Sequence, residues 1–134
     1  NLSKIRDECK QEKFLISYDI DIRALLSAAD LLITDYSSVF FDYCLTDRPM
    51  IFAPFDYEAY IDQDRELYYD YHEVTPGPKC YNWEQVVLEI NKILEGIDEY
   101  SDQRRQINEQ FNKYQDFKNR RRLVDKIIEL PMHE

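Results

Sequence analysis

Residues 28–43 read AADLLITDYSSVFFDY and contain a change from strand to helix within a few residues. Residues 31–33 form a short apolar run, which is typical of a strand buried on both faces of a parallel sheet. Residues 34–38 follow, with side chains that cap helices or form turns. From Val39 to Cys44 the apolar residues recur at helical spacing. The stretch therefore predicts a central buried strand, a tight turn and a helix.

The turn between this strand and this helix is the predicted ligand site. In an open parallel sheet, ligands bind beyond the carboxyl ends of the strands, and the free N–H groups of the next helix attract anions. Ser37 and Ser38 lie at this helix start, where their hydroxyls can join the N–H groups around a phosphate. The two serines can also act simply as helix caps, and the two roles are compatible.

The composition is that of one folded domain without a glycine-rich phosphate loop. The chain has 134 residues, and its 44% hydrophobic and 14% aromatic content excludes a disordered chain, which has few aromatics. It holds only two glycines, so it has neither a P-loop nor a GxGxxG fingerprint. A phosphate must then be held by a helix start and by hydroxyl groups.

The net charge and the cysteines restrict the partners. A formal charge of −10 argues against nucleic acid, because binding to nucleic acid needs a basic surface. Cys9, Cys44 and Cys80 are odd in number without CxxC spacing, so we expect reduced, buried thiols in a cytoplasmic protein. With His72 and His133 they give no zinc-ligand spacing. The sequence predicts no metal and no cofactor.

The chain shows no membrane span and no signal peptide. No apolar run approaches the about 20 residues that a helix needs to cross a bilayer. The chain begins at Asn1 and not at Met, which suggests a piece of a longer polypeptide.

The first half of the chain predicts strands that alternate with helices. A charged surface helix over residues 2–12 precedes a short strand over residues 14–16. A helix capped by Asp21 then leads to the central strand. The predicted buried face of this helix is Ile22, Leu25, Leu26 and Ala29.

The helix from Ser38 to about Leu45 leads through a turn into a third apolar strand over residues 50–53. Residues 54–56, Pro-Phe-Asp, follow this strand and place another polar group, Asp56, at a carboxyl edge. Three strands separated by helices form the doubly wound parallel pattern with right-handed crossovers, so the predicted fold class is α/β.

The second half predicts a loop, a helix and a helical tail. Residues 56–78 are rich in Tyr and acids and predict an irregular functional loop, which the turn at Thr75–Pro78 closes. Asn82 caps a helix that ends before Gly96. Its predicted apolar side is Trp83, Val86, Val87, Ile90 and Ile93. From residue 98 to 130 we expect one or two solvated helices that wrap the domain. The basic residues 120–122 are a solvated face or a contact with anionic lipid.

Several motifs together resemble the C-terminal half of the CDP-glycerol glycerophosphotransferase family, the teichoic acid primases and polymerases of Gram-positive bacteria. In chain order they are ADLLITDYSSVFFDY at 29–43, RPMIF at 48–52, YYDY at 68–71 and PGP at 76–78. The resemblance spans residue 19 to about 95, more than half of the chain. Several motifs in the right order are a specific signal, whereas DYSS alone is a weak one.

The resemblance implies the fold of a larger enzyme. Its architecture is GT-B, in which two Rossmann-like lobes face a cleft. Residues 1–134 would be a single fragment of the C-terminal, nucleotide-binding lobe, with a core over residues 13–95 and a helical tail over residues 98–131. The core would be a Rossmann-like, partial doubly wound parallel sheet, and the C-terminal helices would wrap it.

The resemblance also implies a reaction and a donor site. The parent enzyme would transfer glycerol phosphate, or a related polyol phosphate, from a CDP-activated donor to a lipid-linked acceptor, and release CMP. The implied substrate-binding residues are Asp35, Tyr36, Ser37, Ser38, Asp42 and Arg65. The two serines match positions that hold the donor pyrophosphate, and the two aspartates match the motif acids. Arg65 falls where the family often has Arg followed by Gly, but Glu66 follows it here.

The implied catalytic histidines lie upstream of this chain, because neither His72 nor His133 is in a matching motif. The fragment would bind part of the donor without catalysis of its own, and its partners would be the missing N-terminal lobe and the acceptor. The enzyme would be cytoplasmic, peripheral at the inner face of the plasma membrane.

Other functions are compatible with the same residues. They are a sugar-nucleotide GT-B glycosyltransferase of capsule or cell-wall synthesis and a non-enzymatic phosphate-binding module. A third alternative is a response-regulator receiver with Asp35 as the phosphoacceptor. Against it, the sequence has no acid pair after an earlier strand and no Lys-Pro after a later strand.

Overall fold

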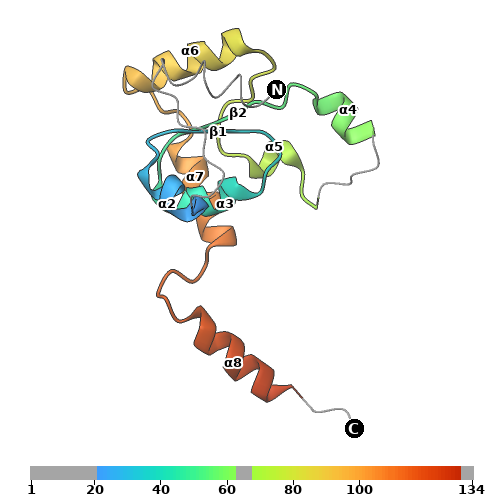
Figure 1. The fold of residues 1–134 in the computed structure, drawn as a ribbon, viewed down its shortest axis with the longest axis vertical. Helices are drawn as coiled ribbons and strands as arrows, with labels where there is room; N and C mark the ends of the chain where they lie inside the picture. Colours follow the sequence, from blue (N-terminus) through green and yellow to red (C-terminus); the bar gives the residue numbers. More distant parts are fainter. Residues whose placement is uncertain (1–20, 63–67, 131–134) are drawn as a thin grey trace.

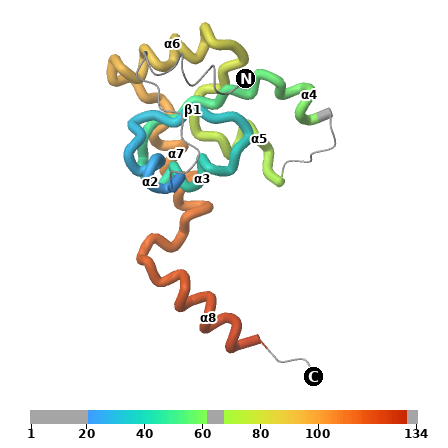
Figure 2. Tube along the Cα trace, in the orientation of Figure 1, coloured from blue at the N-terminus to red at the C-terminus, as the bar shows by residue number. Residues whose placement is uncertain are grey.

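A computed structural model describes residues 21–62 and 68–130, which form a small α/β body and a helix that extends from it (Figure 1, Figure 2). The elements are α2 (Ile22–Ala28), β1 (Leu32–Thr34), α3 (Val39–Tyr43), the 3-10 helix η1 (Cys44–Thr46), β2 (Met50–Phe52), α4 (Tyr57–Asp62), α5 (Tyr71–Val74), α6 (Trp83–Leu94), α7 (Ser101–Phe111) and α8 (Asn119–Glu129). The helix predicted over residues 2–12, the strand predicted over residues 14–16 and Arg65 lie outside the described residues.

The sheet is parallel, as predicted, but its buried strand is β2. β1 and β2 pair with Leu32 opposite Met50 and Thr34 opposite Phe52. On its other side, β2 makes a parallel bridge from Phe52 to Lys79. All three β2 residues are buried, whereas Ile33 of β1 is 40% exposed. The prediction that residues 31–33 are buried on both faces is therefore wrong within the described part of the chain, because there β1 has only β2 beside it.

Three predicted helix boundaries, at Asp21, Asn82 and Gly96, are confirmed. The Asp21 carboxylate accepts a hydrogen bond from the Arg23 N–H at the start of α2, at 3.0 Å. The Asn82 side chain accepts one from the Gln85 N–H at the start of α6, at 2.9 Å. Gly96 follows α6 with φ +82°, the left-handed conformation that ends helices and that glycine adopts without steric cost.

The predicted apolar faces of α2 and α6 are only partly buried. In α2, the core contacts come from Leu26, and Ala29 adds to them just after the helix. In α6, Val86 is buried, whereas Trp83 is 64% and Val87 53% exposed. A periodic pattern shows which side of a helix is apolar. How much of that side is covered depends on the neighbouring elements, and the described sheet is only two strands wide.

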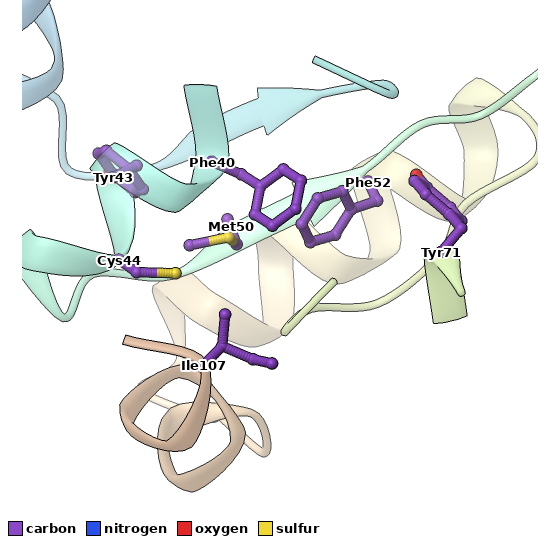
Figure 3. Packing of buried hydrophobic residues seen from close by; sticks show 7 residues of the cluster. All are labelled: Phe40, Tyr43, Cys44, Met50, Phe52, Tyr71 and Ile107. Atoms are coloured by element: carbon purple, nitrogen blue, oxygen red, sulfur yellow. The ribbon is translucent and has the colours of Figure 1, made fainter. Parts of the chain in front are cut away.

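The core lies on both faces of β2. On one face, Met50 and Phe52 belong to a cluster with residues of α3, η1, α5 and α7 (Figure 3). On the other face, Ile51 packs with Cys80 and Val86. This alternation follows from the two-residue period of a strand. Cys44 and Cys80 are free and buried as predicted, and burial raises the pKa of the Cys44 thiol to about 11.

The predicted turn at Thr75–Pro78 is present and is packed into the body. Thr75, Pro76 and Gly77 are buried. A Cβ on Gly77 would lie 2.3 Å from the Met50 carbonyl oxygen, so the turn passes directly against the backbone of β2. The ammonium of Lys79 donates to the Thr75 carbonyl, and burial lowers its pKa to about 8. The turn thus holds the segment around Lys79 beside β2, where Lys79 makes its parallel bridge to Phe52.

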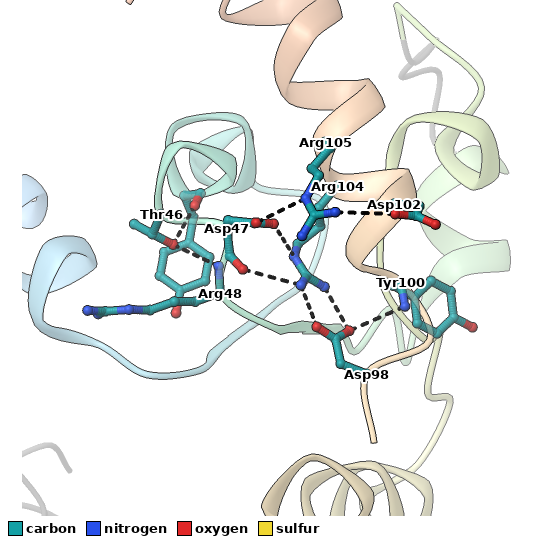
Figure 4. A network of polar contacts seen from close by, with 9 residues as sticks. Thr46, Asp47, Arg48, Asp98, Tyr100, Asp102, Arg104 and Arg105 are labelled. Carbon is teal, nitrogen blue, oxygen red and sulfur yellow. Dashed lines mark hydrogen bonds and ion pairs between the residues drawn. The ribbon is translucent and has the colours of Figure 1, made fainter. Parts of the chain in front are cut away.

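A buried arginine joins α7 to the body (Figure 4). Arg104 is 1% exposed and donates to both oxygens of the Asp98 carboxylate and to the Asp47 carbonyl. These hydrogen bonds hold the pKa of Asp98 below its usual value. Ile107, one turn further along α7, reaches the main core cluster. The first of the two tail helices therefore packs on the body, as the predicted wrapping implies, but it is less solvated than predicted because Arg104 and Ile107 are buried.

The second tail helix does not wrap the domain. α8 has no buried residue, and Figure 1 shows it pointing away from the sheet. The prediction of wrapping helices is wrong for α8, since none of its residues is buried or belongs to either core cluster. Among the described residues, no helix is long and apolar enough to cross a bilayer.

Candidate functional site

The predicted turn lies at the carboxyl edge of the sheet. Residues 35–38 follow β1 directly and lead into α3, as the sequence indicated. The Ala53 N–H donates to the Thr34 carbonyl at 2.7 Å, so the two strands end side by side. Asp56, just beyond β2, reaches the same edge. This is the edge where ligands bind in open parallel sheets.

Asp35 shapes the turn. Its carboxylate accepts a hydrogen bond from the Ser37 N–H at 3.0 Å, which is the geometry of an Asx turn. Both side chains are exposed. The sequence predicted a Ser37 N–H group that is free to bind an anion. In the structure this N–H donates to Asp35 instead, and the Ser37 side chain lies at the surface.

Ser38 begins α3 without acting as a side-chain cap. It occupies the N-cap position, but its hydroxyl makes no capping hydrogen bond. Its carbonyl accepts from the Phe41 N–H at 3.1 Å. The sequence left Ser38 two roles, helix capping and phosphate binding. The structure shows an exposed side chain that does not cap the helix.

Tyr36 belongs to a group of aromatic residues. Its hydroxyl donates to the Asp56 carboxylate at 2.9 Å. Its ring stacks on Tyr60, with centroids 3.9 Å apart and planes 11° apart. Burial, followed by the hydrogen bond to Asp56, raises the pKa of Tyr36. Tyr36 therefore holds α4 against the turn.

Tyr71 supports the turn from α5. It is buried, and its hydroxyl donates to the Asp35 carbonyl at 3.2 Å. Its ring also contacts Tyr36, at 5.5 Å between centroids. The sequence predicted an irregular loop here. It did not reveal that tyrosines of α4 and α5 pack against Tyr36 of the turn. These tyrosines lie 20 to 35 positions after Tyr36, and residues so far apart give no periodic signal in the sequence.

Of the remaining predicted site residues, the structure describes only Asp42. Asp42 is exposed on α3 and lines a shallow hollow with Arg23 and Leu26 of α2. Among the described residues, the Asp42 carboxylate makes no hydrogen bond to residues 35–38. Arg65 lies outside the described residues.

The described part of the turn offers exposed serines and carboxylates as its polar groups. The carboxylates of Asp35 and Asp56 lie at the same edge as Ser37 and Ser38, so a phosphate held here needs a cation to offset them. His72 lies on α5 with its ring edge against Tyr57 and Tyr71. Within residues 21–62 and 68–130, no three His, Cys, Asp or Glu side chains are grouped to hold a metal.

Replacing Tyr36 by phenylalanine tests the link between the turn and α4. We expect the variant to lose about 1 kcal/mol of unfolding free energy, because the Asp56 hydrogen bond is removed while the ring stack remains. Urea unfolding followed by circular dichroism measures this loss. Tyr81→Phe is the control, since its half-exposed side chain has no hydroxyl hydrogen bond among the described residues. An equal loss in both variants would contradict the assignment.

Comparison with known proteins identifies the family. Residues 2–129 match the model of the CDP-Glycerol:Poly(glycerophosphate) glycerophosphotransferase family. The chain belongs to this family. The resemblance first noted over residues 19–95 therefore extends over nearly the whole chain.

Several curated members of this glycerophosphotransferase family are similar to parts of the chain. The teichoic acid poly(glycerol phosphate) polymerase of Bacillus subtilis is 47% identical over 73 residues, which are 54% of this chain and 10% of that protein. The teichoic acid glycerol-phosphate transferase of Staphylococcus aureus is 34% identical over 108 residues, 81% of this chain and 28% of that protein. The chain thus spans less than a third of either relative.

Solved structures of the wall teichoic acid polymerase TagF are also similar. One superimposes with a TM-score of 0.68 at 29% identity, covering 86% of this chain and 28% of that chain. A TagF variant soaked with CDPG has the same TM-score and identity, and covers 95% of this chain and 32% of that one. The described α/β body therefore has the fold of one part of a longer glycerophosphotransferase.

Proposed function

We propose that this chain is the donor-binding part of an enzyme that transfers glycerol phosphate, or a related polyol phosphate, from a CDP-activated donor. The family membership carries this proposal. Both a glycerol-phosphate polymerase and a TagF variant soaked with CDPG are among the similar proteins. The acceptor would be a lipid-linked, teichoic-acid-type chain, and CMP would be released.

In the proposed reaction, an acceptor hydroxyl oxygen attacks the phosphorus on the glycerol side of the pyrophosphate. The bond to the bridging oxygen breaks, and CMP leaves with that oxygen. A base takes the hydroxyl proton. The family resemblance places the catalytic histidines upstream of this chain, so we place the base on the missing N-terminal lobe and expect this fragment to be inactive alone.

We place the donor pyrophosphate at Ser37 and Ser38. Their exposed side chains at the carboxyl edge support this placement, as does the absence of a capping bond from the Ser38 hydroxyl. Asp35 and Tyr36 would hold the turn in shape through the hydrogen bonds described above. The resemblance implies that Arg65 and Asp42 bind substrate, and in this proposal Arg65 would supply the cation while Asp42 would contact the donor from α3.

The proposed whole enzyme has two Rossmann-like lobes in a GT-B arrangement. Residues 1–134 would form a single fragment of the C-terminal lobe, with part of a doubly wound sheet. The parallel β1–β2 pair and the bridge to Lys79 support this proposal. We also propose that the enzyme works on the cytoplasmic side, peripheral to the plasma membrane, where a lipid-linked acceptor is available.

Binding of CDP-glycerol to serine variants tests the proposed site. We expect Ser37→Ala and Ser38→Ala each to weaken CDP-glycerol binding by about tenfold, the effect of one lost hydrogen bond to a charged group. Isothermal titration calorimetry of the 134-residue chain measures this change.

Ser27→Ala is the matched control, because the Ser27 hydroxyl donates to the Arg23 carbonyl on exposed α2, away from the turn. Its affinity should equal that of the unmodified chain. Equal affinity for CDP-glycerol and a UDP-sugar would refute the donor assignment. Unchanged binding in both site variants would refute the placement at the two serines.

A further inference from the structure

α8 carries an apolar face that is unburied and belongs to neither core cluster of the described residues. Leu123, Ile127 and Leu130 lie at intervals of four and three residues, so they share one side of the helix, with Val124 and Ile128 next to them. Ile127 is 57% and Ile128 76% exposed, and Leu123 and Leu130 are similarly open. Phe117, just before the helix, is fully exposed. An isolated 11-residue helix is marginal in water, so a surface that covers this face would stabilise it.

The charges around this face are arranged asymmetrically. At 3.6 residues per turn, Lys126 borders the apolar face on one side and Arg121 borders it on the other. Arg120 lies at its N-terminal end. Asp125 and Glu129 fall on the opposite side of the helix. Cations at the borders of an apolar face and acids far from it are the layout of a helix that lies in an anionic lipid interface.

The charge of the segment contrasts with that of the chain. Residues 113–130 hold six Lys or Arg and three Asp or Glu, whereas the whole chain holds 17 and 27. The segment is therefore cationic on an acidic protein. A negatively charged surface would attract α8 and repel the rest of the chain, which orients the contact.

The ion pairs on α8 leave its cations available. Arg121 pairs with Asp125 at 3.9 Å and Lys126 with Glu129 at 2.6 Å, and all four side chains are 60% or more exposed. Such exposed ion pairs contribute little to stability, so their cations can pair with other anions instead. Arg122 is different. It pairs with Asp116 and lies over the Tyr114 ring at 4.1 Å, so it fixes the segment that leads into α8.

We propose that α8 is an interfacial helix that docks on an anionic lipid bilayer. Leu123, Ile127 and Leu130 enter the boundary between headgroups and acyl chains. Arg120, Arg121 and Lys126 contact the lipid phosphates. This proposal specifies the surface behind the membrane location in the proposed function, but it does not depend on which donor the turn binds.

Vesicle sedimentation with the 134-residue chain, in the absence of nucleotide, tests this proposal. We expect binding to phosphatidylcholine vesicles that contain phosphatidylglycerol, weaker binding as salt is added, and little binding to phosphatidylcholine alone. Replacing Arg120, Arg121 and Lys126 together by glutamine keeps good helix formers at these positions. We expect about a fivefold loss of affinity for each cation removed.

Apolar variants separate insertion from charge attraction. Leu123→Asn with Ile127→Asn should abolish sedimentation with the vesicles. Val87→Asn is the matched control, since Val87 is 53% exposed on a different helix and should bind as the unmodified chain does. All variants should melt at the temperature of the unmodified chain, because α8 contributes no buried residue.

Three results would overturn the proposal. The first is no preference for the anionic vesicles. The second is vesicle binding that survives both sets of substitutions on α8. The third is concentration-dependent dimerisation that the Leu123 and Ile127 substitutions abolish, which would assign the face to a second copy. Loss of donor binding in the serine variants is measured separately, so failure of one proposal does not affect the other.

Discussion

Replacing Gly77 by alanine is expected to destabilise the body by about 3 kcal/mol and to lower its melting temperature by about 10 °C. The added Cβ would lie 2.3 Å from the Met50 carbonyl oxygen and 3.2 Å from a Phe52 ring carbon. The first of these atoms belongs to the backbone of β2, which pairs with β1. Relief of the clash therefore requires the turn or the strand to move.

The flanking residues restrict such a movement. Pro76 and Pro78 have fixed φ angles, and the residue before a proline has fewer allowed conformations than usual. Gly96→Ala is the control. Gly96 has φ +82° and nothing within 4 Å of an added Cβ, so only its conformation is strained, at about 1 kcal/mol. Thermal and urea unfolding followed by circular dichroism compare the two. A Gly77 variant as stable as the Gly96 variant would show that β2 and the turn can separate at low cost.

Replacing Asp98 by asparagine is expected to cost about 3 kcal/mol, because it leaves the buried Arg104 guanidinium without its main counter-charge. The remaining partners of Arg104 are the Asp47 carbonyl at 3.3 Å and the Asp47 carboxylate at 3.8 Å. Arg104→Met should cost less, about 1 kcal/mol. The side chain that stays behind in this variant is Asp98, which is partly exposed and can be hydrated.

Urea unfolding of the two single variants and the double variant measures this coupling. Asp102→Asn is the control on the same segment, since Asp102 is 90% exposed and pairs with Arg105 at 3.4 Å. It should change stability by less than about 0.5 kcal/mol. If Asp98→Asn is no more harmful than this control, Arg104 is not what holds α7 to the body.

The local features of the candidate site could be predicted from the sequence. The order of apolar, turn-forming and again apolar residues between 31 and 44 placed a strand end, a turn and a helix start where the structure has them. Asp21, Asn82 and Gly96 marked helix ends correctly, because caps depend on neighbouring backbone groups. The aromatic support of the turn was not predictable, since Tyr36, Tyr60 and Tyr71 meet only after the chain has folded.

The sequence alone determined the features that depend on neighbouring residues, namely the helix caps and the change from strand to helix. Through several ordered motifs it also determined the family of this chain. It could not rank the apolar positions by burial, because a helical stripe looks alike whether it meets a neighbour or the solvent. The tertiary structure decided that β2 and not β1 is the buried strand, and that Arg104 draws α7 into the body. It also decided that α8 remains apart. Each of these outcomes depends on contacts between residues far apart in the chain, and hydrophobic periodicity carries no information about such contacts.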